Sequence, residues 1–298
     1  MLKTESVNAN SKGIDTKSTR EICLVMNNED KGVAFAVEKA IDSIYPLIDE
    51  IVASFRKGGR LVYIGAGTSG RLGVLDASEC PPTFGVSPDM VVGIIAGGDR
   101  ALRISSESAE DSDESINDLK GISFSSKDVL VGLSASGNAN YVLSALSYAR
   151  TLGAVTGAIC CNQEALSFEY SDYPIFIDVG PEIISGSTRL KSGTAEKMVL
   201  NMLTTVSMIK LGLVYDNYMV NLKATNRKLE NRAKTLIERI AECSREDVDR
   251  VWEESGRSVN ASVLMIKYKV KSSEARAVLE EVDSNLHLAI EKLENRSS

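Results

Sequence analysis

Five short apolar runs alternate with segments of helical spacing, and this alternation most constrains the fold of the 298-residue chain. Each run is too short for a buried helix and is bounded by Gly, Ser or Asp. The runs are Arg60–Gly65, Met90–Ala96, Val129–Leu133, Ala154–Cys160 and Ile175–Val179. Such alternation predicts an α/β fold, a doubly wound and mainly parallel five-stranded sheet flanked by helices. In this class of sheet, ligands bind at the carboxyl ends of the strands.

Helical patterns flank the predicted sheet on both sides in the sequence. Helical spacing begins near Thr19 and recurs over 33–55, whereas residues 1–18 are expected to be loosely ordered. After about Val220 the chain is charged and helical in pattern, with Trp252 as the expected core anchor. We therefore predict an N-terminal helical segment over 1–54, a sheet domain over 55–220 and a small all-helical C-terminal domain over 221–298.

The charge balance and the single histidine exclude several classes of function. A net charge of −7 argues against nucleic acid as a partner, but it is compatible with a small anionic substrate. Because His287 is the only histidine, a His-based zinc site and a serine–histidine triad are excluded. The five cysteines form no Cys-x-x-Cys motif and favour a reducing compartment. With no apolar signal over 1–19 and no run near the roughly 20 apolar residues that span a bilayer, we expect a soluble cytoplasmic protein without membrane contact.

A polar run from Gly180 to Lys197 precedes a predicted helix over Ala195–Lys210. It combines charged side chains, hydroxyls and glycines whose backbone N–H groups can approach a ligand. The side chains are Glu182, Ser185, Ser187, Thr188, Arg189 and Lys191, and the glycines include Gly186 and Gly193. Anions are favoured at a helix N-terminus, so the run predicts an anion site. The alternative is a capped helix with a solvated loop.

A glycine-rich loop, Gly65–Arg71, follows the first predicted strand and matches G-x-G-x-x-G. A dinucleotide site would need an acidic residue about 20 positions further on, and Asp99 comes too late for this role. Thr68 and Ser69 suit a phosphomonoester better, because hydroxyls and N–H groups can converge on one anion. A sugar phosphate is therefore favoured over a nucleotide.

A second hydroxyl-rich loop, Ser134–Asn138, follows the third predicted strand and opens the helix at Tyr141. Loops at neighbouring strand ends converge in a doubly wound sheet. Each loop alone is compatible with helix capping, but together they predict one phosphate site.

These two loops, with G-x-G-x-S and S-x-S-G, resemble a sugar isomerase (SIS) domain over about residues 55–220. The resemblance implies phosphosugar binding and a site built across a homodimer. The chain departs from the commonest pattern at Asn138-Ala139-Asn140, where a threonine often follows S-x-S-G.

Two acidic segments are candidates for proton transfer. Glu79 stands just before Pro81-Pro82, which are expected to end its helix and to fix the carboxylate near the first loop. The alternative for Glu79 is a surface charge at a helix end. The cluster from Glu107 to Glu114 is expected to be a polar helical segment, and for most of its members a solvated face.

From about Ile22 to Leu293 the chain resembles the N-acetylmuramic acid 6-phosphate etherase family. The most specific matches are Gly65–Thr83, Ala109–Ser112 and Gly180–Lys197, the last also shared with glucokinase regulatory protein. The resemblance implies cleavage of a D-lactyl ether at C3 by elimination and then hydration, in cell-wall sugar recycling, with no metal or organic cofactor.

The same resemblance assigns roles to individual residues. Glu79 matches the proton donor to the departing lactate oxygen, and it later activates the water. Glu110 matches the second catalytic glutamate, the best candidate for removing the C2 proton. Glu182 is left open between action at C1/C2 and ordering of the Arg189–Lys191 loop. The residues expected to bind the phosphorylated amino sugar are Gly67, Thr68, Ser69, Ser134, Ser136, Gly137, Asn138, Glu182, Ser185, Ser187, Arg189 and Lys191.

Two other functions stay open from the sequence. A non-catalytic phosphosugar sensor could keep the hydroxyl loops without Glu79 and Glu110. An aldose–ketose isomerase would share the proton abstraction, but it needs no acid directed at a C3 leaving group.

Overall fold

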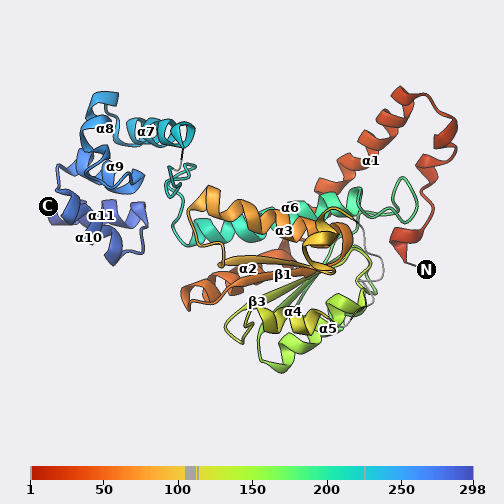
Figure 1. Cartoon of the computed structure of the whole chain (residues 1–298). Helices are drawn as coiled ribbons and strands as arrows, with labels where there is room; N and C mark the ends of the chain where they lie inside the picture. The colour runs from red at the N-terminus through yellow and green to blue at the C-terminus, as the bar shows by residue number, and fades with distance from the viewer. Residues whose placement is uncertain (1, 105–111, 113, 225, 298) are drawn as a thin grey trace. The chain divides into compact units, whose positions relative to one another are not determined.

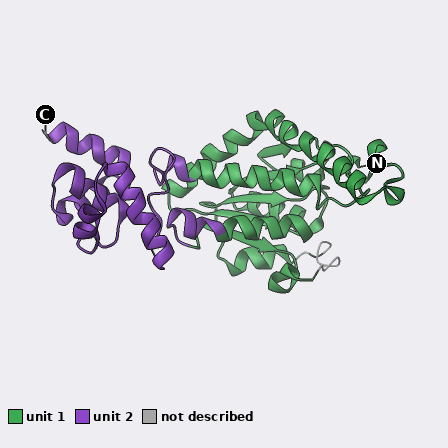
Figure 2. Ribbon diagram, turned by 90° about the horizontal axis from the view of Figure 1, so that it is seen from above, with its two compact units in different colours: residues 1–78, 88–207 green, residues 79–87, 208–298 purple. Residues whose placement is uncertain are grey.

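A computed structural model describes residues 2–104, 112, 114–224 and 226–297 (Figure 1). The chain divides into two compact units (Figure 2). The first unit comprises Met1–Ser78 and Pro88–Ser207, and the second comprises Glu79–Ser87 and Met208–Ser298.

The first unit contains a five-stranded parallel sheet with strand order β2-β1-β3-β4-β5. The strands are β1 (Leu61–Gly65), β2 (Val91–Ile95), β3 (Val129–Leu133), β4 (Val155–Cys160) and β5 (Tyr173–Phe176). The predicted α/β class and the parallel sheet are thus confirmed. The last strand begins earlier than the predicted Ile175–Val179, because Pro174 is tolerated in an edge strand.

Helices cover both faces of this sheet (Figure 1). One face carries α2 (Ile41–Arg56), α3 (Gly67–Phe84) and α6 (Lys191–Lys210), and the other carries α4 (Ser115–Gly121) and α5 (Asn140–Thr151). Glycines permit close packing on each face. A Cβ at Gly157 would lie 2.6 Å from Leu47 of α2, and one at Gly132 would lie 2.7 Å from Val142 of α5. Before α2, α1 spans Thr19–Lys39.

The helix that carries Glu79 does not end at Pro81-Pro82. Both prolines lie inside α3, which continues to Phe84, and the backbone N–H of Gly85 donates to Pro81 O at 2.9 Å. The expectation that the prolines end the helix was therefore wrong. Their missing N–H groups remove only hydrogen bonds close to the C-terminus of α3, so the helix tolerates them there. Glu79 consequently lies within the helix rather than at its exit.

Residues 2–17 are ordered, contrary to the expectation of a loose N-terminus. They form three short 3-10 turns, Lys3–Glu5, Ala9–Ser11 and Ile14–Thr16. Hydrogen bonds tie them to the chain between β5 and α6: Gly186 N donates to Thr4 O at 3.2 Å, and Ser185 Oγ donates to Glu5 O at 2.9 Å. These bonds join the N-terminal turns to residues far away in the sequence, which composition alone does not reveal.

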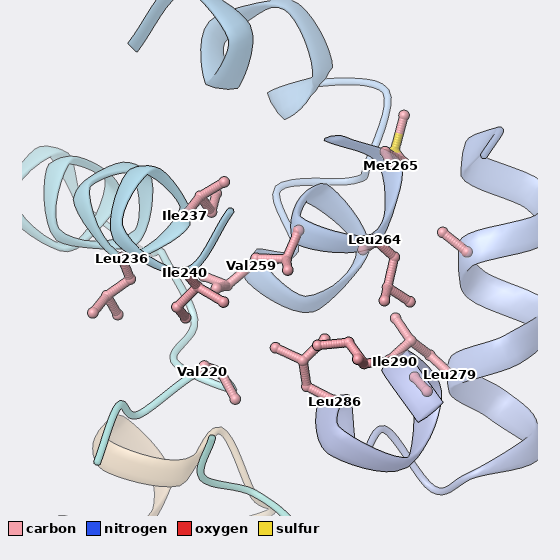
Figure 3. Close-up of a cluster of buried hydrophobic side chains, with 14 of the residues drawn as sticks. Val220, Leu236, Ile237, Ile240, Val259, Leu264, Met265, Leu279, Leu286 and Ile290 are labelled. Carbon is pink, nitrogen blue, oxygen red and sulfur yellow. The ribbon is translucent and has the colours of Figure 1, made fainter. Parts of the chain in front are cut away.

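The second unit is helical around its own core, as predicted for the C-terminal region (Figure 3). Trp252 is only 1% exposed and belongs to this core. The helices are α7 (Arg227–Ala241), α8 (Arg245–Trp252), α9 (Val259–Tyr268), α10 (Ser272–Glu281) and α11 (Leu286–Ser297). None of the described helices has the length and apolar character needed to cross a bilayer.

Candidate active site

The two hydroxyl-rich loops leave neighbouring strands at the same edge of the sheet. Gly65, at the end of β1, pairs with Leu133, at the end of β3. The chain proceeds from β1 to β2 on one side and returns to β3 on the other, so the strand order reverses between β1 and β3. A crevice at such a reversal is where open α/β sheets bind ligands.

The first loop brings the N-terminus of α3 directly against the end of β1. A Cβ at Gly70 would lie 2.6 Å from Gly65 O, so only glycine allows this approach. The side chain of Thr68 is half-buried, and Ser69 is 7% exposed. Backbone N–H groups and two hydroxyls therefore meet at this helix end, an arrangement that suits a phosphate oxygen.

The second loop is held by its own hydroxyls. Gly137 N donates to Ser134 Oγ at 3.0 Å, Asn138 N donates to Ser136 Oγ at 3.3 Å, and the two serine hydroxyls lie 3.3 Å apart. The side-chain carbonyl of Asn138 accepts from Leu166 N at 3.1 Å. None of these side chains caps α5, whose N-cap is Ala139 without a side-chain bond. The capping alternative for this loop is therefore wrong.

We expect Gly137→Ala to destabilise the protein by about 2–4 kcal/mol, combining a strained backbone with overpacking. Gly137 has a φ of 77°, and an added Cβ would lie 2.2 Å from the Cβ of Ala165. Urea unfolding measures the change. Gly153→Ala is the matched control, because Gly153 has a φ of 75° with nothing within 4 Å of the added Cβ. Equal losses at the two positions would contradict the packing argument.

Within the polar run, the carboxylate of Glu182 caps the N-terminus of α6. The helix begins at Lys191 rather than at the predicted Ala195, so Lys191 and Gly193 lie in its first turn and not in a loop ahead of it. The buried Glu182 carboxylate accepts from Lys191 N at 3.0 Å, Ser192 N at 2.9 Å and Ser192 Oγ at 2.8 Å. A carboxylate is favourable at this end of a helix. Of the two roles left open for Glu182, the structure supports the ordering of the segment before α6.

The side chain of Lys191 forms an ion pair inside the protein. Its ammonium lies 2.8 Å from a carboxylate oxygen of Glu29, and the residue is 4% exposed. Burial raises the pKa of Glu29, but hydrogen bonds from Lys191, Asn10 and Asn8 outweigh it and hold the pKa at about 2. This pairing favours a structural role for Lys191 over the expected contact with the substrate, because the ammonium is buried against Glu29.

The other polar residues of the run differ in whether their side chains are available to bind an anion. The hydroxyl of Ser185 bonds to the N-terminal segment, as described above, so it fixes the run instead of presenting a donor. Ser187 is half-buried. Arg189 is exposed and forms no ion pair with any described residue, which leaves its guanidinium available to an anion.

The sequence interpretation missed Glu196, which is fully buried on α6. Its Oε1 lies 2.9 Å from Ser69 Oγ, and its Oε2 has no hydrogen-bond partner among the described residues. Burial raises the pKa of Glu196 to about 8, against the lowering effect of the Ser69 hydrogen bond. Its position on the apolar face of α6 with Val199 and Leu200 was the available signal.

A second contact fixes α6 to α3. Lys197 Nζ donates to Asp76 Oδ1 at 2.6 Å, and the Tyr63 hydroxyl of β1 donates to Asp76 Oδ2 at 3.3 Å. The Asp76 side chain is 4% exposed. This buried carboxylate therefore holds the segment after the first loop in a fixed relation to α6.

The structure describes one of the two predicted catalytic carboxylates. Glu79 is exposed on α3. Glu110 and the stretch from Glu107 to Asp111 lie outside the described residues. Among the residues that are described, no three His, Cys, Asp or Glu side chains gather as a metal ion would require.

The comparisons with known proteins agree with this arrangement. A family model of the glucokinase regulatory protein N-terminal SIS domain matches residues 43–150. A solved structure from Bacteroides fragilis NCTC 9343, described as a candidate phosphosugar isomerase involved in capsule formation, has a TM-score of 0.50. It is 21% identical and covers 65% of this chain and 93% of its own. At this identity the likeness concerns the fold.

Similarity to curated proteins extends over nearly the whole chain. An N-acetylmuramic acid 6-phosphate etherase of Geobacillus thermodenitrificans (strain NG80-2) is 46% identical over 97% of this chain and 99% of its own length. The protein of that name from Glaesserella parasuis serovar 5 (strain SH0165) is 53% identical over 89% of this chain and 88% of its own. The chain therefore belongs to the N-acetylmuramic acid 6-phosphate etherase family.

Proposed function

We propose that this protein is a carbon–oxygen lyase that cleaves N-acetylmuramic acid 6-phosphate to N-acetylglucosamine 6-phosphate and D-lactate, in cell-wall sugar recycling. The near full-length identity to etherases carries this proposal. The glucokinase regulatory protein model favours a sensor, but it matches only residues 43–150. Etherase relatives also cover the segments that hold Glu79, Glu110 and the C-terminal helices, which favours the enzyme.

The phosphate is bound by the two loops at the β1–β3 edge in this proposal. Thr68, Ser69, Ser134 and Ser136 supply hydroxyls, and the N-terminus of α3 supplies backbone donors. Gly67, Gly137 and Asn138 shape the two loops, and Ser187 and Arg189 complete the anion site. Glu182, Ser185 and Lys191 then act by ordering the segment before α6, consistent with the bonds they make. This site belongs to the segment 55–220, which we take as the phosphosugar-binding domain.

The reaction divides the two proton transfers between two carboxyl groups. Glu110 removes the C2 proton of the open-chain aldehyde. The C2–H electron pair forms a C2=C3 double bond as the C3–O bond breaks, the C3–O pair goes to the lactyl oxygen, and Glu79 protonates that oxygen. Glu79 then takes a proton from water as the hydroxyl adds across the double bond at C3, and Glu110, whose proton exchanges with solvent, returns a proton to C2. An acid and a base at one neutral pH require pKa values pushed apart by their surroundings.

The assembly and the compartment are part of the same proposal. The SIS-type fold favours a homodimer with residues of both copies at each site. In the sequence, a helical segment over 1–54 precedes the phosphosugar-binding domain, and a helical domain over 221–298 follows it. The reducing character inferred from the cysteines favours the cytoplasm. The proposal includes no metal or organic cofactor, as the family resemblance implies.

Turnover in isotopically labelled water tests the route. We expect a reaction in D₂O containing H₂¹⁸O to place deuterium at C2 and ¹⁸O at C3 of the sugar product, because elimination exchanges the C2 proton and hydration adds a water oxygen at C3. Mass spectrometry of both products measures this. Appearance of ¹⁸O in lactate, with C2 unlabelled, would instead show cleavage on the lactyl side of the ether.

A further inference from the structure

The buried carboxyl group of Glu196 is not used by the mechanism above, although it touches a phosphate-loop hydroxyl. Its Oε1 is 2.9 Å from Ser69 Oγ, and its Oε2 lies unpartnered among the described residues. A fully buried, ionised carboxylate with one oxygen that accepts no hydrogen bond destabilises the folded state. Glu196 is therefore best accommodated as a neutral carboxylic acid.

Among the residues that the structure describes, no cation acts on Glu196 to favour its ionised form. The thiols of Cys160 and Cys161, at the end of β4, interact with it electrostatically, and burial raises the pKa of both, so both are neutral. On α6 itself, Lys191 pairs with Glu29 and Lys197 pairs with Asp76. These pairs leave no described cation of α6's first turns to stabilise an anionic Glu196.

The buried carboxylate of Glu182 is in the opposite situation. Glu182 also interacts electrostatically with Cys161, but three hydrogen bonds at the N-terminus of α6 compensate its charge. Glu196, by contrast, has one hydrogen bond to the described residues, which joins it to Ser69.

The protonation state decides the direction of the bond to Ser69. An acid proton on Oε2 would have no described acceptor, whereas a proton on Oε1 is hydrogen-bonded to Ser69 Oγ. We propose that Glu196 is a positioning residue whose neutral Oε1–H donates to Ser69 Oγ, which leaves the Ser69 hydroxyl proton free for a phosphate oxygen of the substrate. An ionised Glu196 would capture that proton and would also repel the phosphate.

This inference rests on the proposed function, because it takes Ser69 as a phosphate ligand. Binding of N-acetylglucosamine 6-phosphate, measured by calorimetry from pH 7 to pH 9.5, tests it without turnover. The phosphate has a second pKa near 6 and stays dianionic over this range. Wild-type affinity is expected to fall about tenfold or more as Glu196 ionises, since each pH unit above its pKa reduces the neutral fraction about tenfold.

Glu196→Gln is the decisive variant, because its amide N–H can donate to Ser69 Oγ at every pH. It should bind with near wild-type affinity at pH 7 and show a flat profile up to pH 9.5. Ser69→Ala should weaken binding about 10–100-fold and also flatten the profile. Ser207→Ala, which removes a buried hydroxyl bonded only within α6, is the control and should keep the wild-type profile.

The possible outcomes distinguish the role of Glu196 from the proposed function of the protein. A wild type that binds the phosphosugar, with a Glu196→Gln profile as steep as its own, would overturn the role of Glu196 and leave the proposed function standing. Folded wild type that binds no phosphosugar at any pH would overturn both.

Discussion

Replacing Glu79 by alanine is expected to lower the rate of D-lactate release about 10²–10⁴-fold, the usual contribution of a positioned general acid. The variant loses the proton that the departing lactyl oxygen must receive, and also the group that later activates water. Because Glu79 is exposed, its loss should change the free energy of unfolding by less than about 0.5 kcal/mol. A coupled D-lactate assay and urea unfolding measure the two effects separately.

Ser78→Ala is the control for this variant. Ser78 is the exposed neighbour of Glu79 on α3, and its hydroxyl donates only to Leu75 O at 2.7 Å. Its activity should stay close to that of the wild type. Equal activity of Glu79→Ala and Ser78→Ala would show that Glu79 takes no part in the reaction, however similar this chain is to its relatives.

The second large effect is expected on stability. Glu29→Ala leaves the buried ammonium of Lys191 without its carboxylate, and breaking such a pair costs about 3–5 kcal/mol. It also releases Asn8, which donates to Glu29 at 2.7 Å and ties the N-terminal turns to the body of the unit. Chemical denaturation at pH 7 gives the loss. Asp178→Ala is the matched control, because its pair with Lys3 is about half-exposed and should contribute less than about 1 kcal/mol.

The same ion pair predicts a direction of pH dependence. The folded-state pKa of Glu29, about 2, lies below its ordinary value of 4.5. Its contribution is therefore fully present above pH 4.5 and is lost as the pH falls toward 2. We expect a loss of about 2–3 kcal/mol over this window, somewhat less than the full pKa difference because the pair is partly open to solvent. A wild type and a Glu29→Ala variant with parallel acid profiles would contradict this assignment.

The sheet could be predicted from the sequence because its central strands, β1, β3 and β4, are buried on both faces. Val129–Leu133 was predicted with its observed bounds, since an uninterrupted apolar run leaves little ambiguity. The last strand was misplaced because its edge position admits Pro174, which the apolar pattern excluded. Pro81-Pro82 also led to a wrong prediction, that of the helix end. Near the C-terminus of α3, the loss of two N–H donors affects only the final turns, so the helix continues past the prolines.

The loops of the candidate site could be predicted from the sequence, whereas the roles of its charged side chains could be predicted less well. The hydroxyl and glycine pattern identified Ser69 and Ser134, which the structure brings to one edge. It did not distinguish ligands from structural groups, so Lys191 was taken as an anion binder although Glu29 neutralises it. That pairing joins positions far apart in the sequence, and no local pattern encodes it. Glu196 was detectable only as a carboxyl group at an apolar position of a helix.

The proposed lyase function is tested most directly by D-lactate release from N-acetylmuramic acid 6-phosphate in EDTA, with wild type, Glu79→Ala and Glu110→Ala side by side. We predict release by the wild type that survives chelation and is lost in both variants. Absence of release by folded wild type that still binds N-acetylglucosamine 6-phosphate would contradict the lyase function and would favour a phosphosugar sensor.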